Sequence, residues 1–186
     1  MLTGIPEHTS DVPLPPHRGG MVLYLDIDGV LHPDSVYRKP GRGGPYLLDA
    51  PGHSLFEHAE LLERMLLPYP DLCIVLSTAW VQMYRGSIAK VARRLTPDLR
   101  ARVVGATFNK RMNADTFQRE SRGMQIWSDV LRRQPEAWVA LDDDYLDWPA
   151  HCVEHLVRTH PVLGISTPVV LAELRAKLAY MHGVSP

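Results

Sequence analysis

Cysteine is scarce in this chain, which has only two cysteines among its 186 residues. They cannot build a disulfide framework, and Cys73 in an apolar run and Cys152 in a polar one do not form a zinc-binding pattern. No apolar run approaches the length that spans a bilayer, and the N-terminal region, with Glu7 and Asp11, lacks the apolar core of a signal peptide. We therefore expect a cytoplasmic protein with no membrane partner.

The chain also lacks an excess of either charge, because its formal net charge is −1. The protein as a whole therefore has no general attraction to nucleic acid or to membranes. Locally, however, residues 85–122 contain ten lysines and arginines against three acids. A surface formed by these basic residues could bind along a phosphate backbone. Helical spacing, however, also places basic residues on an ordinary solvated face of a helix. Nucleic-acid binding through residues 85–122 thus stays open.

The composition, 45% hydrophobic and 22% charged, is typical of a globular protein, and the length suits one domain with a sizeable core. Residues 1–20 carry several prolines and little periodicity, so we interpret them as an extended or mobile N-terminal arm. The domain then covers residues 21–186. Its apolar runs alternate with helical patterns, which predicts a doubly wound α/β fold with a parallel sheet and helices on both faces.

Five apolar runs are predicted to be strands, at about 21–26, 72–76, 102–106, 138–141 and 155–158. Four helical patterns are predicted. The first runs from Ser54, which forms a capping box with Glu57, to Pro68, and the second covers 82–95 and is closed by Pro97. The third covers 122–133, and the fourth runs from Thr167 and Pro168 to about 181. Segments 32–52 and 107–121 are predicted to be loops. Arg38, Lys39 and Arg42 make the first loop basic at its tip, and it is either a lid over a site or a solvated loop.

Residues 21–32, MVLYLDIDGVLH, are the stretch around which we expect a site. The apolar run predicts a strand buried on both faces, so Asp26 would lie at its carboxyl end, where open α/β sheets bind ligands. Asp28 follows two residues later, and two carboxylates this close repel each other unless a cation lies between them. Gly29 allows a turn directly after the pair. The pattern predicts a metal-assisted site at the end of the strand.

Two further strands also end in polar residues, Ser77 and Thr78 after the second and Asp142 and Asp143 after the fourth. The histidines are not interpreted as a metal site. His151 and His155 flank a predicted strand start, and no third ligand for a zinc ion is evident. His32 is expected simply to border the site. Asp144 and Asp147 are expected to face solvent.

Asp26-Ile27-Asp28-Gly29-Val30-Leu31 resembles the first motif, DxDGVL, of phosphatases in the haloacid dehalogenase (HAD) superfamily. The resemblance covers roughly residues 21–175, and LSTAW at 76–80 is similar to the HAD domains of RNA repair proteins. It implies a HAD-like, Rossmannoid core of five parallel strands in the order 5-4-1-2-3. Neither gap between motifs holds a convincing extra domain, so we expect no large cap domain. An uncapped site suits a bulky substrate such as a nucleic-acid end.

The resemblance also implies roles for individual residues. Asp26 would be the nucleophile that becomes an aspartyl phosphate, and Asp28 the general acid and base. The second motif needs a hydroxyl that binds the phosphoryl group, for which Thr78 is favoured over Ser77. The third motif needs a cation, for which the candidates are Arg122 and, in reserve, Lys110 and Arg111.

The resemblance also implies a magnesium site, which the fourth motif completes. Mg²⁺ would be held by Asp26, the main-chain carbonyl of Asp28, and Asp142, with Asp143 as a further ligand or as an orienting group. The expected function is a Mg²⁺-dependent phosphomonoesterase acting on a phosphorylated substrate. A small-metabolite phosphatase and a catalytically silent HAD-fold protein that binds a phosphorylated ligand are the alternatives. The oligomeric state stays open.

Overall fold

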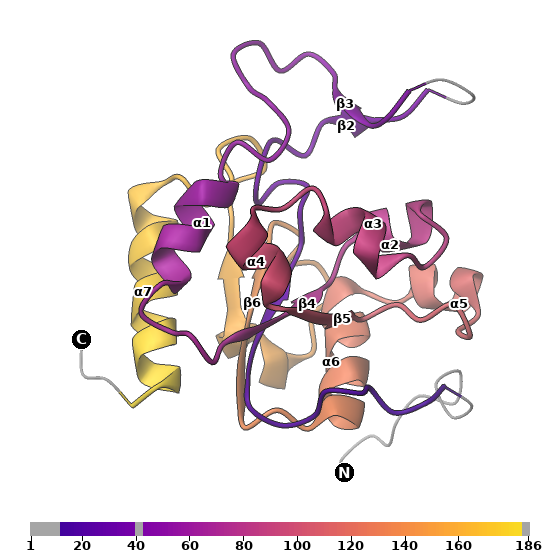
Figure 1. The fold of residues 1–186 in the computed structure, drawn as a ribbon, viewed down its shortest axis with the longest axis vertical. Helices are drawn as coiled ribbons and strands as arrows, with labels where there is room; N and C mark the ends of the chain where they lie inside the picture. Colours follow the sequence, from indigo (N-terminus) through magenta and orange to yellow (C-terminus); the bar gives the residue numbers. More distant parts are fainter. Residues whose placement is uncertain (1–11, 40–42, 184–186) are drawn as a thin grey trace.

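The computed structural model describes residues 12–39 and 43–183. Its centre is a parallel sheet with helices packed against it (Figure 1). The strands are β1 (Met21–Leu25), β4 (Cys73–Leu76), β5 (Val103–Ala106), β6 (Ala137–Asp142) and β7 (Leu156–Arg158). Their spatial order is β5-β4-β1-β6-β7, and each neighbouring pair is parallel. Numbered one to five along the chain and read from β7, this is the predicted order 5-4-1-2-3, so the predicted α/β fold is confirmed.

The register between strands brings three strand ends together. Leu25 at the end of β1 pairs with Leu76 of β4 on one side and with Leu141 of β6 on the other. Because the strands are parallel, the residues that follow these leucines emerge at the same edge of the sheet. They are the polar residues Asp26, Ser77 and Asp142.

Side chains of β1 alternate between two apolar cores. Leu23 and Leu25 belong to the larger core, together with residues of α1 (Ala59–Leu66) and α7 (Pro168–Met181). Val22 and Tyr24 belong to the smaller core, together with residues of α6 (Arg122–Arg133). In Figure 1, α1 and α7 lie to the left of the sheet and α6 to its right. Because helices cover both faces of the sheet, apolar and polar side chains do not alternate along β1.

The helices α6 and α7 are confirmed at their predicted residues. The Ser121 hydroxyl accepts a hydrogen bond from the Met124 N–H (3.3 Å) at the start of α6. The Thr167 hydroxyl accepts one from the Val170 N–H (3.4 Å) at the start of α7. Pro168 at the first helical position loses no hydrogen bond, because the first N–H groups of a helix have no partner within it.

The predicted helix over 82–95 is wrong. The segment and the residues just before it form two short helices, α2 (Ala79–Met83) and α3 (Ile88–Ala92). Between them, Arg85 and Gly86 have φ angles of 55° and 78°, which lie in the left-handed region. A right-handed helix cannot continue through two such residues.

The start of α1 also differs from the prediction, because the helix begins at Ala59 instead of Ser54. The Ser54 N–H donates to Glu57 Oε2 (3.0 Å), so half of the predicted capping box does form. It closes a turn ahead of the helix, since Phe56 has a φ angle of 63° and interrupts the helical backbone.

Two further helices lie where none was predicted. Pro97 does not close a helix but begins α4 (Pro97–Ala101), with the Thr96 hydroxyl accepting from the Leu99 N–H (3.4 Å). The predicted loop over 107–121 contains α5 (Ala114–Arg119), capped by Asn113. Both helices are shorter than two turns, too short for a helical period to stand out in the sequence.

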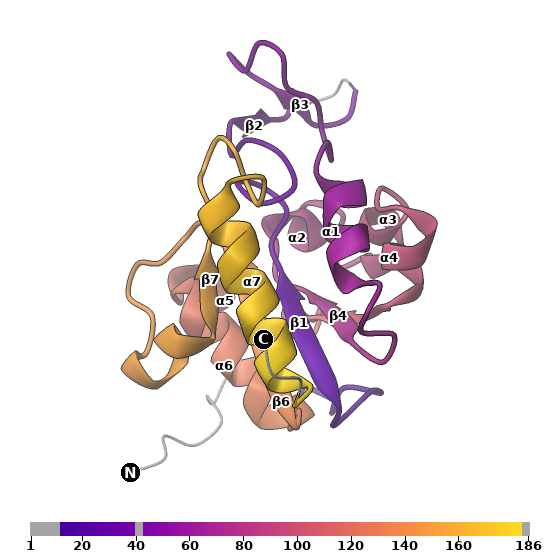
Figure 2. The same cartoon turned by 90° about the vertical axis from the view of Figure 1, so that its left-hand side faces the viewer.

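The predicted loop over 32–52 contains a small antiparallel hairpin of β2 (Val36–Tyr37) and β3 (Tyr46–Leu47), separate from the main sheet. Figures 1 and 2 both show it projecting beyond the end of the sheet near which α1 begins. Of its predicted basic tip, Arg38 and Lys39 are exposed, whereas Arg42 lies outside the described residues. Within the described ranges, no cap domain is inserted into the core.

The described part of the N-terminal arm packs against the domain. Val12 belongs to the larger core, and Arg133 Nη1 donates to the His17 carbonyl (2.6 Å). The Gly19 N–H donates to the carbonyl of Arg133 (3.0 Å). Residues 1–11 lie outside the described residues, and the boundary at residue 20 stays a prediction. Among the helices that the structure describes, none has the length and apolar character needed to cross a membrane.

Candidate active site

Three carboxylates meet where β1 and β6 end. Asp26 follows β1, Asp142 is the last residue of β6, and Asp143 comes next in the chain. Each contributes one oxygen to a group whose members all lie within 4.8 Å of one another. Asp142 is fully buried, Asp26 is 5% exposed and Asp143 is half-buried. The predicted strand-end site is therefore a compact and largely buried acidic cluster.

Arg122, the first residue of α6, reaches this cluster. Its Nη2 lies 3.5 Å from Asp26 Oδ2, and its Nε lies 3.3 Å from Asp142 Oδ2. Its Nη1 donates to Gln125 Oε1 (3.1 Å), and Gln125 in turn donates to the Phe117 carbonyl (2.8 Å). Gln125 thus ties the arginine to the end of α5 and fixes its direction. This orienting role was not predicted, because the sequence pattern gives no sign of it.

The charges in the cluster are out of balance. Burial raises the pKa of Asp26, and Asp28 adds to the effect, although Arg122 lowers it. Burial and then Asp26 raise the pKa of Asp142 well above its usual range. Burial, Asp26 and Asp34 raise the pKa of Asp143 to about 6. One arginine therefore does not compensate three carboxylates, and a further positive charge would stabilise their ionised forms.

The donor atoms fit a magnesium ion. Asp142 Oδ2 is buried and has no hydrogen-bond partner within the described residues, since Arg122 Nε is close but poorly aligned. Leaving a buried carboxylate oxygen without a partner is costly, and a cation ligand would remove that cost. Mg²⁺ takes a few carboxylate oxygens and completes its octahedron with water or phosphate oxygens. Asp26, Asp142 and Asp143 could supply those carboxylates.

Gly29 makes room for one of these carboxylates. Its φ angle is +67°, and a Cβ atom built on it would lie 2.4 Å from Asp143 Cγ. The carbonyl of Gly29 accepts a hydrogen bond from the Thr159 hydroxyl (2.7 Å), which holds the turn in place. Any side chain at this position would displace the Asp143 carboxylate, so glycine is needed both for the turn and for the cluster.

Of the two candidate hydroxyls, that of Thr78 contacts Asp26. Its side chain hydrogen-bonds Asp26, which lowers the pKa of that carboxyl. The same hydroxyl oxygen accepts from the Trp80 N–H (3.4 Å), so it also caps α2. The Ser77 hydroxyl is buried and has no hydrogen-bond partner in the described chain. The geometry favours Thr78 for the second-motif role, as the sequence comparison does.

Of the candidate cations, Arg122 contacts the carboxylates. Lys110 lies exposed in the loop between β5 and α5, with its Cβ beside Gly86, and Arg111 is exposed next to it. Neither lines the cavity beside the cluster. The tertiary structure therefore brings Arg122 to the site and leaves its two reserves at the surface.

A polar cavity of about 210 Å³ adjoins the cluster. Thr78 and Arg122 line it on the side of the site. The Gln82 and Gln118 side chains also line it, with the Gln118 amide N–H donating to the Gln82 oxygen (3.2 Å), and the Gln82 nitrogen has no hydrogen-bond partner among the described residues. A phosphoryl group held by Thr78 and Arg122 would thus have space beside it for a neutral, hydroxyl-bearing part of a substrate.

Asp28 lies beside the cluster and is held by two residues that were not predicted to act on it. Its Oδ1 accepts from Trp80 Nε1 (2.7 Å) and is 3.0 Å from His32 Nε2. His32 was expected only to border the site, yet it is fully buried. The signal for Trp80 was its place in LSTAW, but its partner could not be read from the sequence.

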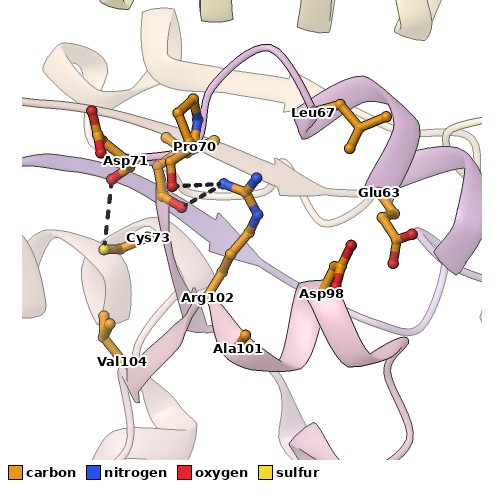
Figure 3. A pocket seen from close by; sticks show the side chains of 10 residues that line it. Glu63, Leu67, Pro70, Asp71, Cys73, Asp98, Ala101, Arg102 and Val104 are labelled. Atoms are coloured by element: carbon orange, nitrogen blue, oxygen red, sulfur yellow. Dashed lines mark hydrogen bonds between the residues drawn. The ribbon is translucent and has the colours of Figure 1, made fainter.

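A larger cavity, of about 500 Å³, lies at the opposite end of the sheet, beside the starts of β4 and β5 (Figure 3). Its arginine, Arg102, donates to the backbone carbonyls of Leu66, Tyr69, Pro70 and Leu72 at 2.6 to 3.3 Å. These bonds tie the end of α1 and the following turn to the residue just before β5, in addition to the backbone N–H groups that already donate to the Leu66 and Tyr69 carbonyls (3.0 and 3.3 Å). Arg102 therefore stabilises the fold there.

His151 and His155 have aromatic partners. The His155 ring stacks on Trp138 at 4.0 Å and its Nδ1 pairs with the Trp138 carbonyl (2.9 Å). His151 meets Trp127 edge to face at 4.5 Å. Both belong to the 3₁₀ helix η2 (Ala150–His155), which packs beside α6. Their contacts are those of structural residues.

We expect the substitution Asp142→Ala to weaken Mg²⁺ binding by about tenfold or more, since it removes a buried ligand oxygen. Asp144→Ala is the matched control: its side chain is exposed, and only its backbone N–H contacts Asp142 (3.0 Å). Isothermal titration with Mg²⁺ measures both affinities. Equal losses in the two variants would contradict the assignment of Asp142 as a ligand.

Comparison with known families gives a match. The model of a family described as the HAD domain in Swiss Army Knife RNA repair proteins matches residues 22–170. That range includes every residue of the acidic cluster, Thr78 and Arg122. No curated protein and no solved structure matches the chain significantly.

Proposed function

Since the chain belongs to the family of HAD domains in Swiss Army Knife RNA repair proteins, we propose that it is a Mg²⁺-dependent phosphomonoesterase. The observation that carries this proposal is the placement of Asp26. It combines a carboxylate nucleophile with the Thr78 hydroxyl and the Arg122 guanidinium in a cluster suited to a divalent cation. Those are the groups that phosphoryl transfer through a covalent intermediate needs.

In the proposed reaction an Asp26 oxygen attacks phosphorus, and the ester P–O bond breaks to leave an aspartyl phosphate. Thr78 and Arg122 bind equatorial phosphoryl oxygens, and Asp28 gives a proton to the leaving oxygen. A water molecule then attacks the phosphorus, gives its proton to Asp28 and releases Asp26 and inorganic phosphate. Bound Mg²⁺ would supply charge compensation between the carboxylates and the phosphoryl group.

We propose a phosphorylated nucleic-acid end as the substrate, and three observations support this choice. The matching family is named for RNA repair, and within the described residues the core carries only a small hairpin instead of a cap. Most basic residues of the 85–122 stretch are also exposed, as a backbone-binding surface requires. They are Arg85, Lys90, Arg93, Arg94, Arg100, Lys110, Arg111 and Arg119. Both cysteines are free thiols, in keeping with a cytoplasmic location.

A small-metabolite phosphatase is the second candidate, and the cavity of about 210 Å³ favours it. Such a cavity is large enough for the sugar of a small phosphorylated compound but not for a long chain. A panel of phosphorylated oligonucleotide ends, nucleotides, sugars and peptides separates the two candidates by kcat/KM. The oligonucleotide end should have the highest kcat/KM, and a sugar phosphate with a higher value would favour the second candidate.

The basic test is hydrolysis of a generic aryl phosphate with and without the metal. We expect activity to fall by about tenfold or more after exhaustive EDTA treatment and to return when Mg²⁺ is added, because the carboxylates need a counter-charge. Full activity without added metal would contradict the magnesium requirement. No hydrolysis of any phosphate ester in Mg²⁺ would instead favour a silent protein that binds a phosphorylated ligand.

A further inference from the structure

Asp28 is held by one oxygen only. Its Oδ1 receives the Trp80 indole N–H (2.7 Å) and faces His32 Nε2 (3.0 Å). Within the part of the chain that the structure describes, its Oδ2 has no hydrogen-bond partner. The side chain is 28% exposed, whereas His32 and Trp80 are fully buried. Two rigid donors therefore converge from the protein interior on a carboxylate at the edge of the site.

The backbone fixes the direction of the His32 donor. Nδ1 of this histidine accepts a hydrogen bond from the Phe56 N–H (3.0 Å), so Nδ1 carries a lone pair. The ring proton is then on Nε2, which donates it to Asp28. Phe56 presents its N–H from a left-handed conformation, with a φ angle of 63°, which the turn ahead of α1 maintains.

Ring packing holds the Trp80 donor in place. Its ring centroid lies 5.3 Å from that of Phe56 and 6.0 Å from that of His32, both in edge-to-face geometry. The Arg94 guanidinium covers the indole at 5.3 Å from its centroid. The backbone N–H of the same tryptophan bonds the Thr78 hydroxyl (3.4 Å), so α2 places the indole and the phosphate-binding hydroxyl together.

We propose that His32 and Trp80 are positioning residues that anchor Asp28 by Oδ1 and so present Oδ2 to the leaving oxygen of the substrate. The inference rests on the proposed phosphomonoesterase function. It adds that one carboxylate oxygen is permanently occupied and that the other transfers the proton. A carboxylate free to rotate would spend less time in the geometry for proton transfer, and small misplacements of a catalytic group are costly.

Leaving-group dependence separates positioning from a merely structural role. An alkyl phosphate needs the proton from Asp28, whereas an activated aryl phosphate leaves without it. We expect Trp80→Phe, which removes the N–H and keeps a ring, to lower kcat for an alkyl phosphate about 10- to 100-fold and for an aryl phosphate less than about threefold. His32→Leu should do the same. His32→Gln, which keeps an N–H donor, should restore part of the alkyl rate.

Trp127→Phe is the matched control, because this tryptophan contacts His151 outside the site and its indole N–H has no hydrogen-bond partner in the described chain. It should leave both rates unchanged. Equal losses on the two esters in Trp80→Phe and His32→Leu would overturn the positioning role while leaving the phosphatase function intact. A wild-type protein that hydrolyses neither ester would overturn the function and, with it, the inference.

A measurement without turnover covers the case in which the buried substitutions prevent folding. In the ¹⁵N-labelled full chain, the Trp80 indole N–H resonance should move upfield in Asp28→Ala, since the carboxylate partner is lost. Asp28 is partly exposed, so this variant should fold. An unchanged resonance would show that the indole is not bonded to Asp28 and would overturn the proposal.

Discussion

Asp26→Asn should lower kcat on any phosphate ester on the order of 10⁴-fold or more, since an amide cannot form the covalent phosphoryl intermediate. The fold should persist, because the substitution removes one negative charge from a cluster in which burial and neighbouring carboxylates raise the pKa values of three aspartates. The thermal midpoint should therefore stay equal to that of the wild type or rise above it.

Steady-state hydrolysis of an aryl phosphate in Mg²⁺ and thermal unfolding of the same preparation in EDTA check both expectations. Asp147→Asn is the control for loss of one carboxylate, since that side chain is exposed and is not a member of the carboxylate cluster. Substantial turnover by Asp26→Asn would rule out Asp26 as the nucleophile. A lower thermal midpoint would mean that the carboxylate stabilises the fold, against the charge argument.

Asp28→Asn should reduce hydrolysis of an alkyl phosphate on the order of 10²-fold or more and that of an activated aryl phosphate far less. An alkoxide is a poor leaving group at neutral pH and needs a proton as the P–O bond breaks, whereas an activated phenolate does not. The amide preserves an oxygen that can accept from Trp80 and His32 but has no proton of suitable acidity to donate.

The informative quantity is the ratio of the two rates in one variant, because errors in enzyme concentration cancel in it. A large change in the ratio supports Asp28 as the acid. If both rates fall by the same factor, Asp28 positions the metal or the backbone, and the proton comes from another group.

The strands, α6 and α7 could be predicted from the sequence because their signals are local. A strand buried on both faces, such as β1, must be a continuous apolar run, and residues such as Thr167 and Pro168 mark a helix start within a few positions. The placement of Asp26 and Asp142 followed from the same logic, since both come directly after a buried apolar run. Parallel pairing then brings such ends together.

The short helices were not predicted because the local sequence signals in those segments are weak or misleading. The left-handed Arg85 and Gly86 divide a segment whose apolar spacing suits one continuous helix. Phe56 adopts a positive φ angle that its residue type does not favour, in a turn that supplies an N–H to His32. Such a conformation persists only where the surrounding contacts maintain it.

The choice among equivalent side chains also needed the tertiary structure. Thr78 rather than Ser77, and Arg122 rather than Lys110, contact the cluster because side-chain direction depends on register and helix orientation. The contact of Asp28 with Trp80 joins residues that lie 52 positions apart in the chain. The local sequence pattern therefore determines which chemical groups form the site. Which residues they contact depends on how helices and strands pack together, and neighbouring residues in the sequence do not reveal that packing.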